Sequence, residues 1–245
     1  MKAIKAGVLN ETVKVLSRKK YQVFLLLTCL LSIAICSLGG FKIGFIGLSS
    51  INTPLTVLSL ATEFILPLMI AMAAADLFTA EQENGSIKAT ITRPVSRISI
   101  LTSKMLAIVL YTILVLLICL VISLVYSIVF NGIGVSNIAE VLLAYAVSIV
   151  PMLPITLFAV TVSQLCKNSS STVMLFVFGY IVLAVASIVL PNISPMLFTS
   201  YTGWYKLFIG ATMPIAYILN VLALLVAYTL IFFAISSWAF EKKEY

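Results

Sequence analysis

The chain has 245 residues, of which 62% are hydrophobic and 9% are charged, and its mean hydropathy is +1.19. Because soluble domains carry about 25% charged residues, this composition excludes an ordinary water-soluble fold. The net charge is +7. The basic residues follow the edges of apolar runs, so we attribute this charge to membrane topology and anionic lipid and predict no nucleic-acid binding.

Residues 1–20 precede the first long apolar run. Six apolar residues share one half of a helical wheel: Ile4, Val8, Leu9, Val13, Val15 and Leu16. Glu11 and Lys14 lie on the other half with Arg18. This pattern predicts an amphipathic helix on the cytoplasmic membrane surface, with a frayed basic tail as the alternative. The first apolar run lacks a cleavage site and is expected to remain as an anchor.

Six uncharged or nearly uncharged runs are long enough to cross a bilayer, which needs roughly 20 apolar residues. The predicted spans are 21–38, 55–78, 100–130, 138–164, 173–190 and 215–238. The sequence therefore predicts an all-α polytopic membrane protein, with residues 1–245 forming a single transmembrane domain.

The distribution of Lys and Arg sets the expected orientation. With six spans, 13 of the 15 basic residues fall on the side that holds both termini, and only Lys42 and Lys206 fall on the other. Positive charge is retained on the cytoplasmic side. We therefore expect cytoplasmic termini in a cell membrane, and a bacterial source.

Two features interrupt the later spans. Pro151 and Pro154 lie inside the fourth span and should kink or unwind it near mid-membrane. Residues 191–214 are rich in aromatic side chains and too apolar for a free loop. They predict an outer re-entrant segment before the last span.

Several kinds of chemistry are missing. The chain has no histidine and no GxxxxGK[ST] motif, which removes His-dependent nucleophile pairs, HExxH zinc sites and ATP binding through a P-loop. The four cysteines form no CxxC pair and are interpreted as small apolar residues. We predict no catalytic residue, no metal site and no bound cofactor.

Glu63 is the exceptional charge, since it lies about two turns inside the second predicted span. An intramembrane carboxylate is a functional candidate that binds a cationic group or is held protonated within the bundle. Alternatively, it lies close enough to the outer interface to stay hydrated. Pro67, one turn further, is expected to open a backbone carbonyl beside it. We take Glu63, Pro67, Pro151 and Pro154 as a candidate substrate pathway.

A polar island, residues 76–104, separates the second and third spans. Residues 80–91 are expected to form a short cytoplasmic helix with Glu81 and Glu83 near its positive N-terminal end. Pro94 ends it. Ser96 or Ser99 is expected to cap the third span, while Arg97 and Lys104 anchor it by snorkelling.

The polar island, with residues 79–99 as its cytoplasmic coupling loop, resembles the first cytoplasmic loop of ATP-binding-cassette (ABC) type-2 permeases. The matching residues, with Ser86 where threonine is usual, are Glu81, Glu83, Gly85, Ser86, Pro94, Ser96, Arg97 and Lys104. The amphipathic N-terminal helix, the six spans and the aromatic segment fit the same plan.

This resemblance implies an ABC exporter. The coupling loop that would contact a separate cytoplasmic ATPase comprises Glu81, Glu83, Asn84, Gly85, Ser86, Ile87, Arg93, Pro94, Ser96 and Arg97. Two ATPase copies, carrying ATP and Mg, would join two permease subunits, identical or related. The substrate would be an antibiotic, an antimicrobial peptide or another small amphiphile.

Three alternatives stay open at this stage. The island could be only a solvated loop with anchoring arginines. The chain could instead be a secondary carrier that uses Glu63 as a proton or cation site, although carriers of that kind usually show inverted repeats. It could also be a membrane scaffold or sensor subunit that transports nothing.

Overall fold

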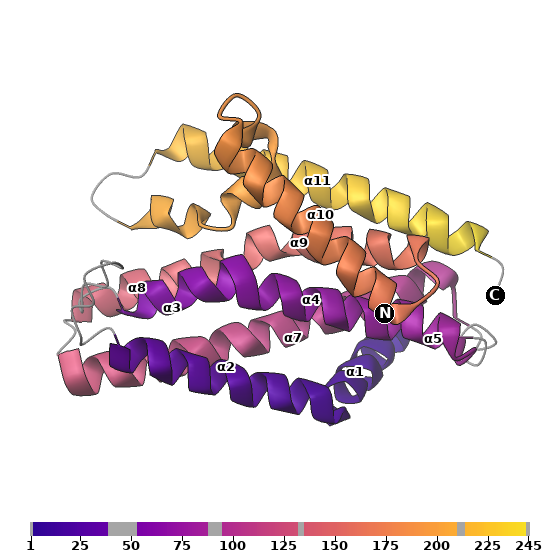
Figure 1. The fold of residues 1–245 in the computed structure, drawn as a ribbon, viewed down its shortest axis with the longest axis horizontal. Helices are drawn as coiled ribbons and strands as arrows, with labels where there is room; N and C mark the ends of the chain where they lie inside the picture. Colours follow the sequence, from indigo (N-terminus) through magenta and orange to yellow (C-terminus); the bar gives the residue numbers. More distant parts are fainter. Residues whose placement is uncertain (1, 39–52, 88–94, 132–134, 210–213, 244–245) are drawn as a thin grey trace.

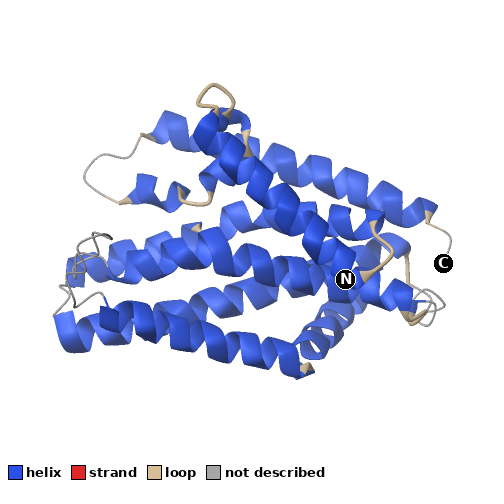
Figure 2. Ribbon diagram, viewed as in Figure 1, coloured by secondary structure: helices blue, strands red, loops and turns tan. Residues whose placement is uncertain are grey.

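The computed structural model describes residues 2–38, 53–87, 95–131, 135–209 and 214–243. These residues form helices and connecting loops, with no strand among them (Figure 2). Within these described segments, six helices are long and apolar enough to cross a membrane, as the sequence predicts. They are Lys19–Ser37, Thr53–Glu83, Arg97–Phe130, Ile138–Leu165, Ser169–Val189 and Ile215–Lys242. The chain is a multi-pass membrane protein.

The spans are built from the following elements. The first is α2 (Lys19–Leu38), preceded by α1 (Lys2–Ser17). The second joins α3 (Thr53–Leu60), η2 (Ala61–Ile65), α4 (Leu66–Ala74), η3 (Ala75–Thr79) and α5 (Ala80–Glu83). The third is α7 (Arg97–Tyr126) with η4 (Ser127–Asn131), and the fourth is α8 (Val135–Val147) with α9 (Ile149–Leu165). The fifth is α10 (Ser169–Val189) and the sixth is α11 (Ile215–Lys242).

The spans lie side by side along the long axis of the molecule, while α10 crosses the bundle obliquely (Figure 1). Helix α1 turns across one end and packs on α7. The same end holds α5 and the C-terminal end of α11 (Figure 1). Helix α1, the end of the second span and the end of the last span therefore gather at one end of the bundle.

The second span is the core of the bundle. In its most apolar 18-residue stretch 61% of the residues are buried, against 11% in the corresponding stretches of the fifth and sixth spans. The small buried side chains of Ala71, Ala73, Ala74 and Ala75 let neighbouring helices approach closely. The exposed side chains of α2, α10 and α11 are largely apolar, as expected of surfaces that face lipid tails.

Two π-helical turns interrupt the second span, and each holds a carboxylate. Glu63 lies in η2 and Asp76 lies in η3. Such turns are rare and occur often at functional sites. After η2, Pro67 lacks the N–H that an α-helix would donate to the Glu63 carbonyl, so irregular backbone is expected here.

The fourth span is divided at Ser148, between α8 and α9. Ser148 keeps helical dihedral angles (φ −64°, ψ −13°), and its N–H donates to the Ala144 carbonyl at 3.1 Å. The prolines at 151 and 154 therefore interrupt the span without unwinding it. Both are buried.

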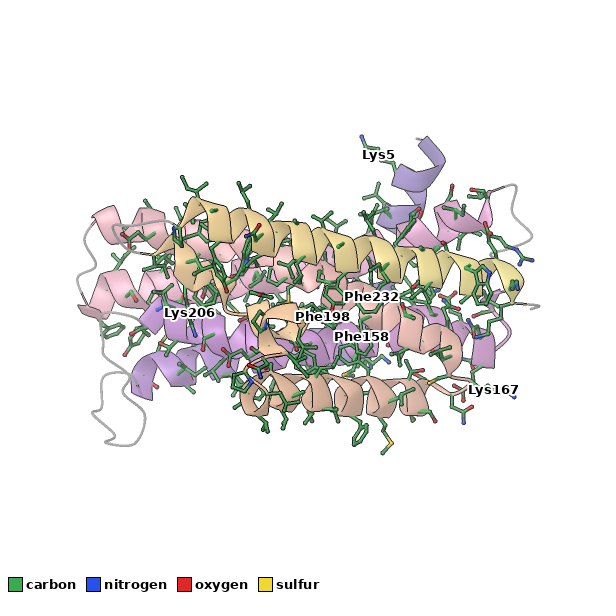
Figure 3. All side chains as sticks on the ribbon, turned by 90° about the horizontal axis from the view of Figure 1, so that it is seen from above. Lys5, Phe158, Lys167, Phe198, Lys206 and Phe232 are labelled. Atoms are coloured by element: carbon green, nitrogen blue, oxygen red, sulfur yellow. The ribbon has the colours of Figure 1, made fainter. Side chains whose placement is uncertain are left out.

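The aromatic segment before the last span folds back onto the bundle as three short 3₁₀ helices. They are η5 (Ser194–Met196), η6 (Phe198–Tyr201) and η7 (Trp204–Phe208). Phe198 lies 5.8 Å from Phe158 of α9 and 5.6 Å from Phe232 of α11, between ring centroids (Figure 3). This aromatic cluster holds the segment against the spans.

Candidate functional site

Within the polar island, the chain leaves the second span through a turn centred on Gly85. The Asn84 N–H donates to the Ala80 carbonyl at 3.0 Å, and the Gly85 N–H donates to the Gln82 carbonyl at 3.1 Å. Gly85 has φ +68°, a left-handed conformation that glycine adopts without steric cost and that commonly ends helices. The expected helix over residues 80–91 is therefore interrupted: α5 continues the second span and ends at Glu83, and Ile87 is helical again after the turn. Residues 88–91 lie outside the described residues.

Only part of the expected docking surface is exposed. Glu83, Asn84, Gly85 and Ser86 are exposed and form what we call the loop tip, Glu83–Ser86. Glu81 and Ile87 are 3% and 1% exposed, so both face the interior. This corrects the expectation that they belong to the contact surface. The Glu83 carboxylate accepts a hydrogen bond from the Ser169 N–H at 3.2 Å.

Glu81 is buried against Lys104. The Lys104 ammonium, which is fully buried, donates to Glu81 Oε2 at 2.7 Å and to the Leu77 carbonyl at 2.9 Å. It also lies 5.8 Å from the centre of the Phe78 ring. A buried charge pair is tolerated only where hydrogen bonds satisfy it in this way. The expectation that Lys104 snorkels to the membrane surface is therefore wrong.

Two residues of α1 complete this cluster. Lys14 Nζ pairs with Glu81 Oε1, and Glu11 Oε2 lies 3.5 Å from Lys104 Nζ. We call Glu11, Lys14, Glu81 and Lys104 the charged network. It joins α1 to the second and third spans.

The network also changes how α1 is oriented. The sequence pattern placed Glu11 and Lys14 on a water-facing side, but Glu11 is 7% exposed and both point to the bundle. Leu9 and Val13, in contrast, are exposed. The reason is that Glu11 and Lys14 form ion pairs with residues of two other helices, and a helical wheel of α1 alone does not include those partners.

Asp76 forms a second charged contact at the same end. It is buried, accepts a hydrogen bond from the Tyr21 hydroxyl at 2.6 Å and lies 3.3 Å from Arg18 Nη1. Lys20 pairs with the same carboxylate. Asp76, interpreted from the sequence as a boundary residue, instead joins the first span to the second.

Glu241 and Lys243, at the C-terminal end of α11, contact residues that come before and after the loop tip. Lys243 Nζ donates to Gln82 Oε1 at 2.6 Å and to the Gln164 carbonyl at 2.8 Å. Burial lowers the pKa of the Lys243 ammonium. Arg97, expected to anchor the third span by snorkelling, donates to the Glu241 carbonyl at 2.7 Å.

The third span begins as the sequence predicts, with a serine cap. Ser96 has extended backbone, and its hydroxyl accepts the Ser99 N–H at 3.3 Å. The helix then starts at Arg97 rather than at residue 100. Arg93 and Pro94 lie outside the described residues.

Glu63 lies apart from the island, about 15 Å along the helix from Thr53, at 1.5 Å per residue. Its side chain is half-buried, and its backbone carbonyl accepts a hydrogen bond from the Tyr180 hydroxyl at 3.1 Å. The side chain lines two cavities of about 590 and 360 Å³. Pro67 lines the larger one, but Pro151 and Pro154 line neither, so only half of the candidate pathway comes together.

Sequence reasoning missed the charged network as a unit. A lysine inside the apolar run of the third span was a usable signal, since Lys104 needs a partner once buried. Glu11 and Lys14 gave no such signal, because both fit a solvated face of α1. Their pairing depends on where α1 packs.

The comparison with known proteins places the chain in a family. Residues 25–245 match the family described as "Protein of unknown function (DUF2705)". The chain belongs to this family. No curated protein matches it. The match includes all six spans except the start of the first, together with the loop tip and Glu63.

Proposed function

We propose that this DUF2705 chain is the transmembrane permease subunit of an ATP-driven ABC exporter. The observation that carries the proposal is the loop tip, Glu83–Ser86. It is exposed at the end of the most buried span, directly beside the buried charged network. A partner that pushes on this tip would act on the core of the bundle.

The charged network would transmit such a displacement to neighbouring helices. Glu81 lies two residues before the tip and contacts Lys104 of α7 and Lys14 of α1. Displacing the end of the second span would separate these pairs or carry α1 and α7 with it. Because unpairing buried charges is unfavourable, coordinated movement of the three helices is the favoured response.

The expected membrane orientation supports a cytoplasmic partner. Lys5 and Lys167 lie at one end of the bundle and Lys206 lies at the other (Figure 3). The positive-inside rule then puts the loop tip and the ends of α1 and α11 in the cytoplasm of a bacterial cell membrane. In this orientation Leu9 and Val13 of α1 would insert into the inner interface, and residues 191–209 would re-enter the outer leaflet.

The working assembly would hold two permease subunits and two copies of a cytoplasmic ATPase. ATP and Mg would bind to the ATPase and not to this chain, which has no P-loop. The exported substrate would be a small amphiphile, an antibiotic or an antimicrobial peptide.

Co-purification tests the partner. Tagged chain, extracted from the membrane of its own organism, should bring down an ABC ATPase. Charge reversal at the tip, Glu83→Lys, should reduce recovery of that ATPase and uncouple ATP hydrolysis from export. Lys5→Glu, an equal reversal at an exposed residue of the same end, should leave both unchanged. Recovery of no ATPase would rule out the exporter and leave the secondary carrier and the scaffold or sensor role.

A secondary carrier is the alternative, favoured by the half-buried carboxylate of Glu63. It predicts transport in liposomes that contain only this chain, driven by a proton or cation gradient. Glu63→Gln should abolish such transport. ATP-dependent export that survives collapse of the gradient would exclude the carrier.

A further inference from the structure

The Glu63 carboxylate lies within the span and has no partner in the part of the chain that the structure describes. Among the described residues, none donates a hydrogen bond to this carboxylate and none forms an ion pair with it. The Tyr180 hydroxyl bonds to the backbone of Glu63 and leaves the side chain unoccupied. This contrasts with Asp76 and Glu81 of the same helix, which are both paired. A charge inside a membrane protein normally has a partner.

The larger cavity beside Glu63 is an apolar groove. It has a volume of about 590 Å³, within the range of small-molecule sites. Its walls come from the second span, α10 and η6. Lining residues of α10 run from Phe176 to Ile188, which is about 18 Å along that helix and enough for a long alkyl chain.

A second polar group in the groove also lacks a partner among the described residues. Thr199 of η6 lines the groove, is 5% exposed, and its hydroxyl oxygen forms no hydrogen bond with the described residues. A buried hydroxyl without a partner is unfavourable in protein interiors. This hydroxyl and the Glu63 carboxylate line the same space.

The smaller cavity supplies a polar compartment next to the groove. It has a volume of about 360 Å³ and shares Glu63, Ser200 and Thr202 with the groove. Lys206 lines only this second cavity. Glu63 thus lies where an apolar space meets a polar one, as the charged head of an amphiphile requires.

The groove is bordered by exposed apolar residues. Phe64 is 66% exposed and Ile188 is 79% exposed, and both line it. In the membrane these side chains would face lipid tails. An amphiphile dissolved in the bilayer would therefore reach the groove without crossing water.

We propose that Glu63 and this groove bind a single-chain amphiphile with a cationic head group. The ammonium pairs with the Glu63 carboxylate and the Thr199 hydroxyl accepts a hydrogen bond from it, while the alkyl chain lies along α10. The site would deepen the proposed export function by setting its substrate class. Binding itself requires neither ATP nor a partner subunit.

Saturable binding of radiolabelled dodecylammonium tests the site. The full-length chain would be held in phosphatidylcholine nanodiscs, with empty nanodiscs subtracted for partitioning. Glu63→Gln should weaken binding about tenfold or more, since it removes the charge of the ion pair. Glu140→Gln removes an exposed carboxylate that lines neither cavity and should leave binding unchanged.

Two further sets of experiments distinguish the contribution of the cationic head group from that of the alkyl chain. Ala184→Phe should fill the groove and abolish binding, whereas Ala186→Phe on the same helix, outside the cavity lining, should not. Dodecylammonium should bind in preference to dodecyl sulfate and dodecyl maltoside, and butylammonium should bind weakly. Lys206→Ala should strengthen binding, because it removes a like charge from the neighbouring cavity.

The proposal is overturned if Glu63→Gln binds as the unaltered chain does, or if dodecyl sulfate competes as well as the ammonium. Thermal unfolding of each variant shows whether lost binding reflects lost folding. The assay contains no ATPase, so its failure is distinguishable from failure of the exporter proposal. Binding without a recoverable ATPase would remove the exporter and keep the site.

Discussion

The Trp204 indole N–H donates to the Val147 carbonyl at 3.0 Å. Val147 is the residue whose helical donor would be the N–H of residue 151, and that residue is Pro151. A side chain of the aromatic segment therefore satisfies a carbonyl that a proline leaves open. Neighbouring groups compensate membrane prolines in this manner because no water is present to do so.

This relationship predicts a compensating pair of substitutions. Trp204→Phe should destabilise the protein by about 1–3 kcal/mol, because it leaves a partly buried carbonyl without its donor. In a Pro151→Ala background the restored N–H should reduce that loss. Thermal unfolding in detergent measures the four variants of the cycle. Equal losses in both backgrounds would show that the indole contributes by packing alone.

The buried pair of Lys104 and Glu81 predicts a strong asymmetry between single and double substitutions. Lys104→Met should destabilise the fold by about 3–5 kcal/mol, because it weakens the pairing of a buried carboxylate. Adding Glu81→Gln should recover part of the loss. Lys5→Met, at an exposed lysine, is the matched control and should change the unfolding midpoint little. No recovery in the double variant would argue against direct pairing.

Gly7 is expected to set how closely α1 approaches α7. A Cβ at Gly7 would lie 2.7 Å from Ser103 Oγ and 3.1 Å from Ser103 Cβ. That hydroxyl is held by the Ser99 carbonyl at 2.6 Å, so it cannot simply turn aside. Gly7→Val should loosen α1 and increase its proteolysis, and Ser103→Gly should restore protection. Ala6→Val, at an exposed neighbour, should have no such effect.

The effect of a substitution at Gly85 should depend on whether the new residue can adopt the left-handed backbone conformation, and not on the space around the side chain. The Gly85 φ of +68° is unfavourable for a side chain, although no atom of the described residues beyond its two chain neighbours lies within 4 Å of the position a Cβ would take. Gly85→Val should destabilise the turn by about 1–2 kcal/mol, whereas Gly85→Asn should cost less. If the loop tip contacts the ATPase, Gly85→Val should also reduce coupled ATP hydrolysis. Equal effects of Val and Asn would show that contact, not backbone conformation, decides the outcome.

The six spans were predictable because hydrophobic run length is a local property. Their predicted starts and ends agree with the structure within a few residues, except where polar residues continue a helix. Thr79 and Glu81 extend the second span beyond its predicted end at residue 78. They remain helical because their side chains find buried partners: the Thr79 hydroxyl donates to the Ser163 carbonyl at 3.0 Å.

The candidate loop was predictable only in outline. Polarity and the glycine marked where the chain turns, and Ser96 marked the start of the next helix. The inward direction of Glu81, however, could not be read from its surroundings in the sequence. Acidic residues on a polar loop are ordinarily solvated, and only the nearby lysines of two other helices make burial favourable.

The amino-acid sequence alone predicts that this protein is helical, has six segments long and apolar enough to cross a membrane, and forms a polar turn between the second and third of them. Those properties follow from the length of apolar runs and from the positions of charges along the chain. That Lys104 and Lys14 meet at Glu81, while Glu63 lies beside a groove with no ion-pair partner among the described residues, is seen only in the folded protein. The reason is that such pairings depend on the rotation of each helix about its own axis and on which helix lies next to it.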